Sequence, residues 1–408
     1  MKLVKLDQSH RVSFEKLMKF SFPPEDEEEN EEVALFLKNE RIWDDAYGWF
    51  DGDTLVSSYS SYSAQFKIRN TFFNVKFIDL VATLPTYRKK GLVRKGLKME
   101  LEKNFGSQFH FFSLGPFKQE FYRNLGFETV MDSRKIEFDF DFLSKKTDFL
   151  GYRTKIGILK EDSNLREDLM QIKKWMGEQS RYNQAKIPEL FDEVFFQLSK
   201  KYVAIAYDEN SIPKGYMIFS EIDQILKITY IQYIDLQAFY ALKQFLLSYK
   251  DQVKGIHFTS IQPDLPIDLL IDNYWLTGKK CLVQDNSWRM FRIVNLESIL
   301  REICKELPDK EIYLKVSDNL LKQNNGIFIL SKSKIEKFNL YSGKIDAVIS
   351  ISDLVPLLSG RKSSFELYLT GKLTIPENEK IFNSKSLAPP IISEFNKIFP
   401  KLTTFGIL

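Results

Sequence analysis

The stretch FIDLVATLPTYRKKGLVR, residues 77–94, decides the fold of this chain. Residues 77–82 are apolar and partly β-branched, which predicts a strand. Pro85 then ends that strand, since proline cannot donate to a β-ladder. Val93, Leu97 and Leu101 follow at four-residue spacing, which predicts a helix with one apolar stripe. The order is therefore a strand, a basic turn with one glycine, and a helix.

A turn of this kind can bind phosphate. The first amides of a helix have no intrahelical partner, and the helix dipole favours an anion there. Gly91 lets the backbone approach a ligand closely. Six cationic residues lie between positions 88 and 98, namely Arg88, Lys89, Lys90, Arg94, Lys95 and Lys98. From spacing alone, an ordinary strand–helix unit with a solvated basic face remains an equal alternative.

The segment 88–93 resembles the acetyl-CoA pyrophosphate loop of the GNAT N-acetyltransferases, with Val93 in place of the usual small residue. The motif FYRNLGF at 121–127 adds to this likeness, and the two together resemble the Eis-type (enhanced intracellular survival) acetyltransferases. The resemblance implies an α+β fold. It implies tandem GNAT domains, each with a mixed, mostly antiparallel sheet and flanking helices, followed by a domain like sterol carrier protein.

Composition narrows the class of protein. The chain has 408 residues, enough for two or three domains, and a net charge of +3, too small to indicate nucleic-acid binding. Cys281 and Cys304 are the two cysteines, which suits a reducing cytoplasm. No apolar run approaches about 18 residues, so a soluble cytoplasmic protein without a membrane partner is expected. The histidines at 10, 110 and 257 have no ligand spacing, and no metal is expected.

Three domains are expected, at residues 1–146, 147–286 and 287–408. In the first, strands are predicted over 46–50 and 55–62, with another over 66–75 around a turn near 69–70. The second repeats the order of elements but has no phosphate turn, and the resemblance implies a GNAT-like domain without a cofactor site. The third resembles sterol carrier protein, with Ser352 as the expected N-cap of a helix. A lipid carrier would need an open apolar tunnel there.

The acidic run from Glu25 to Glu32 has two interpretations. It is typical of a solvated helix start, where the helix dipole favours acids. The alternative is an acidic lip that attracts a cationic substrate.

Tyr122 and Leu408 are the expected catalytic residues. A phenol with a pKa near ~10 can protonate a departing thiolate whose pKa is near ~8.5. Position alone favours an ordinary core tyrosine, and it is the resemblance that implies the role of general acid. The chain ends in TTFGIL, an apolar tail whose burial would desolvate the α-carboxylate of Leu408 and raise its pKa. The resemblance implies that this carboxylate is the general base.

Acetyl-CoA is the expected co-substrate. No cysteine lies near the phosphate turn, so direct attack in a ternary complex is expected rather than an acyl-enzyme. Backbone amides near Val81 and Thr83 would hold the thioester arm, and the basic turn would hold the pyrophosphate. The expected cofactor-binding residues are Val81, Ala82, Thr83, Lys89, Lys90, Gly91, Leu92, Val93, Arg94, Phe117 and Lys118.

The acetyl acceptor would be an amine, either polyamine-like as in an aminoglycoside or a lysine of a peptide or protein. The resemblance further implies a homohexamer. Two alternatives remain: a tRNA-dependent aminoacyl transferase of tandem GNAT type, and a non-catalytic CoA- or lipid-binding protein.

Overall fold

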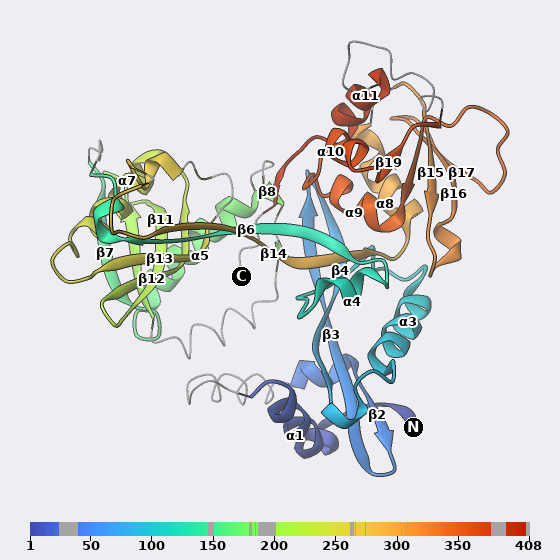
Figure 1. Cartoon of the computed structure of the whole chain (residues 1–408), viewed down its shortest axis with the longest axis horizontal. Coiled ribbons are helices and arrows are strands. Elements are labelled where there is room, and N and C mark those ends of the chain that lie inside the picture. Colours follow the sequence, from blue (N-terminus) through green and yellow to red (C-terminus); the bar gives the residue numbers. More distant parts are fainter. Residues whose placement is uncertain are drawn as a thin grey trace. The chain divides into compact units, whose positions relative to one another are not determined.

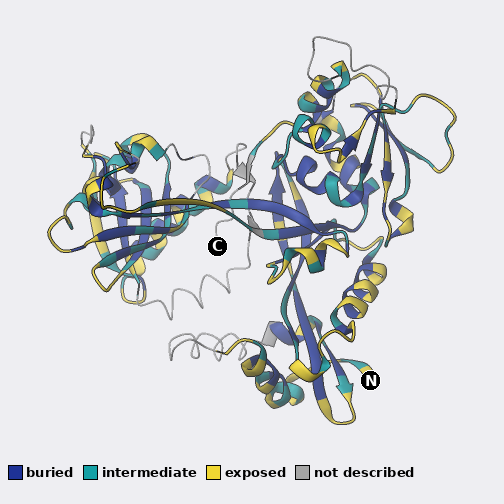
Figure 2. Cartoon of the chain, in the orientation of Figure 1, coloured by how far each residue is buried: buried dark blue, intermediate teal, exposed yellow. Residues whose placement is uncertain are grey.

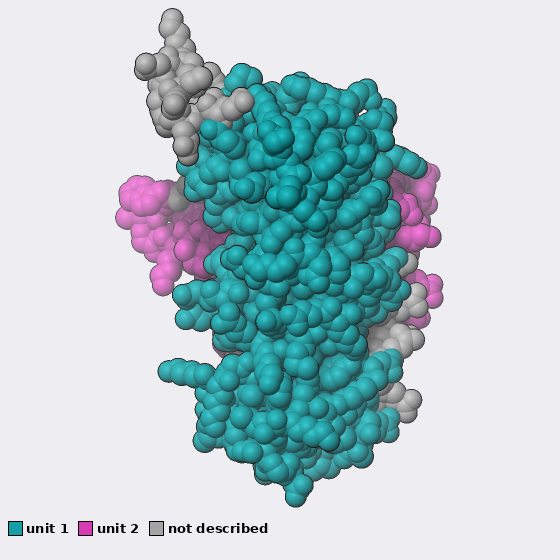
Figure 3. Space-filling model, turned by 90° about the vertical axis from the view of Figure 1, so that its right-hand side faces the viewer, with its two compact units in different colours: residues 1–131, 183–188, 288–404 teal, residues 132–182, 189–287, 405–408 magenta. Residues whose placement is uncertain are grey.

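The chain forms two compact units, coloured separately in Figure 3. The first unit comprises residues 1–131, 183–188 and 288–404, and the second comprises 132–182 and 189–287. The structure is a computed structural model that describes residues 1–23, 40–145, 151–178, 182–183, 185–186, 201–261, 265, 267–273, 275–307, 309–376 and 389–404.

The first unit is built on a sheet in which β1 to β4 are successive antiparallel neighbours, while β4 and β5 pair in parallel. Figure 1 labels β2, β3 and β4 of this sheet. Residues 290–293 of β14 pair antiparallel with β5. The elements are β1 (Lys2–Lys5), α1 (Arg11–Ser21), β2 (Ala46–Asp51), β3 (Thr54–Ile68), β4 (Thr71–Thr83), α3 (Leu92–Asn104), β5 (Phe111–Leu114), α4 (Gln119–Arg123), β6 (Glu128–Asp139) and β14 (Cys281–Ile293).

Strands β3 and β4 form one long hairpin, which the sequence reading had broken into shorter strands. The segments predicted over 55–62 and 66–68 join within β3, which is 15 residues long. The turn near 69–70 is confirmed, with Arg69 at a φ of 56°, and β4 then runs without interruption through the predicted phosphate strand. The strands continue because side chains on both of their faces are buried along much of their length (Figure 2).

Helices and the third domain cover this sheet with three apolar clusters. Helix α1 packs Phe14 and Leu17 against Ala46 and Leu55 of the sheet. Helix α3 packs Leu97 and Leu101 against residues that include Tyr59 and Ile78. In a third cluster, Phe73, Val75 and Phe77 of β4 belong to the same core as Leu296, Ile299 and Leu300 of the third domain. The first and third domains therefore share one hydrophobic core.

The third domain has its own sheet, with the strand order β17-β16-β15-β18-β19 and helices packed against it. Its elements are α8 (Leu296–Ile303), β15 (Ile312–Ser317), β16 (Gly326–Leu330), β17 (Ile335–Phe338), β18 (Ala347–Ser350), α9 (Ile351–Leu358), α10 (Ser364–Leu369), β19 (Leu373–Thr374) and α11 (Pro390–Ile398). Leu314, Phe328, Leu354 and Phe395 are fully buried in it.

The expected helix cap at Ser352 is wrong by two residues. Ser350 is the N-cap of α9, and its hydroxyl accepts from the amide of Asp353 at 3.1 Å. Ser352 instead lies in the first turn, where its hydroxyl is 2.9 Å from that of Ser350. Both serines precede the same apolar run, so the residue pattern could not separate them.

The second unit repeats the plan of the first domain. Residues 134–139 of β6 pair with β13, and the order continues through β12, β11, β10 and β7, in which only β12 and β13 are parallel neighbours. Its elements are β7 (Arg153–Ile158), α5 (Ser163–Glu178), β10 (Tyr202–Tyr207), β11 (Pro213–Ile222), β12 (Ile225–Tyr233), α7 (Leu236–Leu247) and β13 (Gly255–Ile261). The remaining strands are β8 (Tyr182–Asn183), β9 (Ala185–Lys186) and β20 (Thr403–Thr404).

Mostly antiparallel sheets with flanking helices confirm the predicted α+β fold class. The acidic run at 25–32 lies outside the described residues. In the part of the chain that is described, no helix combines the length and apolar character needed to cross a membrane.

A buried ion pair fastens α3 to the sheet. The ammonium of Lys76 on β4 contacts the carboxylates of Glu100 on α3 and Asp45, and only 5% of its side chain is exposed. Glu100 also accepts from Asn104 Nδ2 at 2.9 Å, and its side chain is 3% exposed. A charge in such a place is stable only with its partner present.

We expect Lys76→Met to destabilise the protein strongly, because it leaves the Glu100 carboxylate buried without its main cation. Losing one partner of a buried pair costs about 3–5 kcal/mol. The matched control is Lys103→Met, since Lys103 lies 4.0 Å from Glu100 with 60% of its side chain exposed, and such pairs are worth about 0–1 kcal/mol. Denaturant melts measure both variants, and equal losses would contradict this account.

Candidate active site

The site begins where two parallel strands part. Strands β4 and β5 pair from Val75 with Phe111 to Ile78 with Leu114. Strand β5 ends there, whereas β4 continues to Thr83 while remaining paired with β3 on its other edge. Beyond Ile78, the β4 edge that faced β5 is thus left without that ladder partner, and its backbone groups can bind an extended, amide-bearing ligand.

A β-bulge at Leu80 marks the point of parting. Ser60 pairs with Asp79 and Ser58 pairs with Ala82, so β4 carries one extra residue over this interval. Leu80 has a φ of 49°, an uncommon conformation for a residue with a side chain. Such conformations cluster at functional sites.

Serine hydroxyls of β3 hold the bulged backbone. Ser57 Oγ donates to the Ala82 carbonyl at 2.9 Å, and Ser58 Oγ donates to the Leu80 carbonyl at 3.5 Å. Ser60 Oγ donates to the Asp79 carbonyl, also at 3.5 Å. The run of serines in β3 therefore supports the site, although the sequence reading did not single it out.

Gly91 is the N-cap of α3, at the end of the turn that follows β4. Its φ is 74°, and no side-chain hydrogen bond caps the helix. A β-carbon built at Gly91 would have no atom within 4 Å, so there is open space beside Gly91 at the helix start. An uncapped helix start of this kind is suited to an anion.

The basic side chains of the turn are exposed. Arg88, Lys89, Lys90 and Arg94 all lie on the surface around Gly91. Lys90 Nζ stands 4.1 Å from the centre of the Tyr87 ring, and Arg88 Nε donates to the Thr83 carbonyl at 3.3 Å. Leu92 is buried and Val93 is half-buried, so these two can serve a ligand only through their backbone.

Tyr122 lies on α4 and is 1% exposed. Its ring contacts Phe117, Phe121 and Phe127 at centroid distances of 5.7, 5.0 and 6.1 Å. Burial, with the nearby Asp79 carboxylate, raises the pKa of the Tyr122 phenol above its ordinary value. Phe117 is 73% exposed beside it, and Lys118, the residue before α4, is exposed too.

Asp79 is a residue that the sequence reading missed. It sits at the bulge, where its carboxylate accepts from the Leu80 amide at 2.8 Å. Burial raises the pKa of Asp79, against the lowering effect of that hydrogen bond and of Arg289. The Asp79 charge in turn raises the pKa values of Tyr62 and Tyr122. The signal in the sequence that could have identified Asp79 is an acidic residue inside an otherwise apolar strand.

The structure thus groups most of the predicted residues in the first unit. Val81, Ala82 and Thr83 lie on the parted strand, and residues 89–94 form the turn and helix start that follow it. Leu408 lies outside the described residues. Among the residues that are described, no group of three or more His, Cys, Asp and Glu side chains is arranged to hold a metal.

The second unit has the same local plan with a different helix start. Strands β12 and β13 pair only from Ile225 to Ile228, and a register shift follows on β12. The next helix, α7, is capped by Asp235, whose carboxylate accepts from Ala238 N at 2.9 Å and from Tyr152 Oη at 2.9 Å. An acid here occupies an amide that a phosphate would bind, and its charge opposes an anion. The absence of a cofactor site in this domain stays a prediction.

Comparison with known families places three domains along the chain. A model described as an acetyltransferase (GNAT) domain matches residues 4–130, and a second model of that description matches residues 184–293. A model described as a sterol carrier protein domain matches residues 296–402. No protein of curated function has a matching sequence.

Several solved structures share the fold over nearly the whole length. A probable N-acyltransferase from Enterococcus faecalis has a TM-score of 0.77 and 16% identity, with 99% of this chain and 97% of that chain covered. A GCN5-related N-acetyltransferase from Anabaena variabilis has a TM-score of 0.75 and 18% identity, covering 99% and 98%. Eis1 from Mycobacterium abscessus has a TM-score of 0.73 and 16% identity, covering 100% and 99%.

The chain is an acetyltransferase with two GNAT domains and a C-terminal sterol carrier protein domain. Its architecture is that of the Eis-type proteins, as the sequence motifs predicted. The expected domain limits at residues 146 and 286 remain predictions.

A GNAT domain implies acetyl-CoA as co-substrate, and the first domain fits that molecule. The open space at Gly91 and the exposed cations suit a pyrophosphate. The edge of β4 beyond Ile78 suits the amides of the pantetheine arm.

We expect Gly91→Ala to weaken acetyl-CoA binding about tenfold, because a side chain at a φ of 74° strains the turn whose amides would hold the pyrophosphate. Gly106→Ala is the matched control, since Gly106 follows the other end of α3 with a φ of 82° and equally open space. Calorimetric titration measures the dissociation constant. A similar loss in both variants would show that strain alone is responsible.

Proposed function

We propose that this protein transfers the acetyl group of acetyl-CoA directly to an amine within a ternary complex. The observation that carries the proposal is the uncapped, glycine-started helix α3 next to the parted strands β4 and β5. These features belong to one compact unit, which also contains the buried phenol of Tyr122. In this proposal, residues 89–94 hold the pyrophosphate and the backbone at Val81 and Thr83 holds the arm and the thioester carbonyl.

Tyr122 is proposed as the general acid. Its raised pKa keeps the phenol protonated through neutral and mildly alkaline pH. The same shift makes the phenol a weaker acid, so the transfer of its proton to the thiolate depends on close positioning of the two groups. The bond to sulfur breaks as the amine nitrogen attacks the carbonyl carbon, and the phenol proton passes to sulfur. Exposed Phe117 and Lys118, just before α4, would contact the arm of the co-substrate.

The α-carboxylate of Leu408 is proposed as the general base, on the strength of the Eis-type resemblance. It would remove a proton from the attacking amine, directly or through a water. A carboxylate is a weak base in water, so the role requires that the tail be buried, where desolvation raises the pKa.

The proposed acceptor is a cationic amine, either polyamine-like as in an aminoglycoside or a lysine in a peptide. Asp79 supports a cationic acceptor, because it lies close to Tyr122 and a cation bound beside it would favour its charged form, which burial alone disfavours. A cation near a carboxylate is favoured, and burial strengthens that attraction.

A screen of amines tests the function. We expect release of the CoA thiol from acetyl-CoA only when a suitable amine is present, with turnover that rises with amine concentration. Incubation of the enzyme with acetyl-CoA and labelled CoA, without amine, should give no exchange of label, since no acyl-enzyme forms. Failure of polyamines, aminoglycosides and lysine peptides alike to release CoA would refute the proposal and favour a binding protein.

Removing either proton-transfer group should lower kcat while leaving acetyl-CoA binding unchanged. We expect a loss of about 10²-fold or more for Tyr122→Phe, and a similar loss when one residue is added beyond Leu408. Steady-state rates and calorimetric titration separate the two effects.

Tyr207→Phe is the control for removal of a buried tyrosine hydroxyl. Tyr207 lies in the second unit, is 3% exposed and donates to Asp168 at 2.5 Å. Its kcat should equal that of the unmodified enzyme. Full activity in the extended protein would exclude the tail carboxylate, while full activity in Tyr122→Phe would exclude the phenol.

A further inference from the structure

Arg292 is a buried cation that the proposed chemistry does not use. It lies on β14, and none of its side chain is exposed to solvent. Its guanidinium makes hydrogen bonds in three directions: Nε to the Leu125 carbonyl at 2.9 Å, Nη1 to the Ile293 carbonyl at 2.7 Å, and Nη2 to both oxygens of Asp318 at 2.8 and 2.6 Å. Such a planar fork can fix several groups at once.

The bond to the Leu125 carbonyl reaches the turn that follows Tyr122 and helix α4. The Leu125 amide donates to the Tyr122 carbonyl at 2.9 Å, and the Leu125 carbonyl accepts from Arg292. Gly126 follows with a φ of 81°, and a β-carbon there would lie 2.8 Å from Arg292 Nε. The glycine of the FYRNLGF motif therefore serves the approach of the guanidinium as well as the left-handed turn.

The other end of the contact is held by the third domain. Asp318 follows β15, is 2% exposed, and accepts from the amides of Leu320 and Leu321 at 2.9 and 3.0 Å. Asn324 Nδ2 donates to the same carboxylate at 2.9 Å, while Asn324 Oδ1 accepts from the Leu296 amide at 3.0 Å. The carboxylate is thus fixed by two backbone amides and by Asn324 in addition to the arginine.

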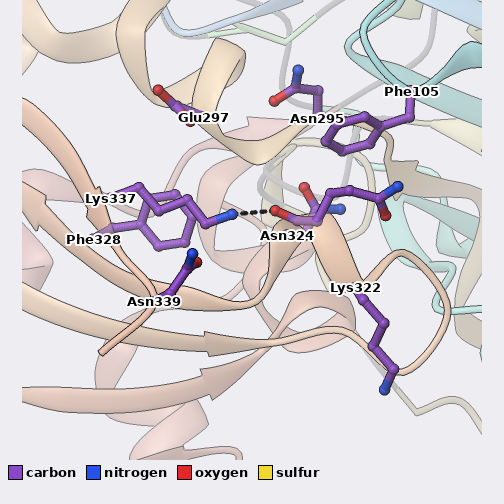
Figure 4. A pocket seen from close by; sticks show the side chains of 9 residues that line it. Phe105, Asn295, Glu297, Lys322, Asn324, Phe328, Lys337 and Asn339 are labelled. Carbon is purple, nitrogen blue, oxygen red and sulfur yellow. Dashed lines mark hydrogen bonds between the residues drawn. The ribbon is translucent and has the colours of Figure 1, made fainter. Parts of the chain in front are cut away.

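Asn324, which donates to Asp318, also lines a pocket between α3 and the third domain. The pocket has a volume of about 520 Å³ and is lined by Asn324 with Phe105, Phe328 and Lys337, among others (Figure 4). Lys337 Nζ donates to the Gln323 carbonyl beside it. The segment that follows Asp318 is therefore also held by a hydrogen bond from Lys337.

Helix α4 needs such an anchor. It has five residues, and Lys118 at its N-cap makes no side-chain hydrogen bond to it. An isolated helix of this length is unstable, so its geometry depends on tertiary contacts. The general acid proposed above is carried by this helix.

We propose that Arg292 and Asp318 are positioning residues for Tyr122, through which the sterol carrier protein domain holds the general acid in place. The inference rests on the proposed function of Tyr122. In this arrangement the third domain contributes to catalysis through its interior, in addition to any contribution of its tail.

The test is the double variant Arg292→Met with Asp318→Asn. Removing both charges together leaves neither one buried without its partner, and asparagine can still accept from the amides of Leu320 and Leu321. The Leu125 carbonyl then loses its donor, and the turn after α4 loses that contact. We expect faster hydrogen–deuterium exchange over residues 116–127, with unchanged exchange over 92–104. We also expect kcat to fall about 10- to 100-fold without a change in acetyl-CoA affinity, because small displacements of a reacting group have effects of this size.

The matched control is Lys76→Met with Glu100→Met, a second buried ion pair of this unit, which contacts α3 instead of α4. Its kcat and its exchange over 116–127 should match the unmodified protein. Should the first double variant not fold, Arg292→Lys replaces it, since lysine keeps the charge but lacks the planar fork that reaches the Leu125 carbonyl and both oxygens of Asp318 at once.

Unchanged exchange over 116–127, or unchanged kcat, in a folded variant would overturn the proposal. An unmodified protein that acetylates no amine would refute the proposed function instead, and the exchange measurement would still decide whether Arg292 holds α4.

Discussion

The candidate site depends on the hydrogen bonding of a β-sheet at the point where two of its strands separate. Every amide and carbonyl on a strand requires a partner, and β4 loses the partner β5 beyond Ile78. The bulge at Leu80 turns the strand there, and hydroxyls of Ser57 and Ser58 satisfy its carbonyls from the opposite side. One edge of β4 is thereby kept available while the other stays firmly paired. The helix start at Gly91 and the phenol of Tyr122 have functional meaning only in relation to that edge.

The shared core explains why a domain so distant in sequence bears on this site. Phe77 of β4 and Leu300 of α8 belong to one apolar cluster, so the third domain packs directly on the sheet that carries the candidate site. The Arg292–Asp318 pair lies within the same unit and fixes the orientation in which these segments pack. Apolar contacts hold surfaces together without specifying orientation closely, whereas a forked hydrogen-bonding group fixes it.

Local chemistry in the sequence was sufficient for the part of the site that is contiguous along the chain. The proline, the basic turn and Gly91 predicted the strand, turn and helix start, because each acts on its own neighbours. The same reasoning could not find Asp79, Arg292 or the serines of β3, whose roles come from partners far away in sequence. It also divided one long hairpin into shorter strands and placed a helix cap at Ser352 instead of Ser350. In those cases, burial on both faces and competition between adjacent serines decided the outcome.

The cap on α7 makes that helix start independent of a bound anion. Asp235 neutralises the helix end with a carboxylate that is part of the chain. A helix whose first amides have such an internal partner does not need a ligand to satisfy them. The start of α3 has no side chain in that position, so water or an anion must fill the same role there. Two helix starts in similar places therefore differ in what completes them: a residue of the chain in one, and a molecule from solution in the other.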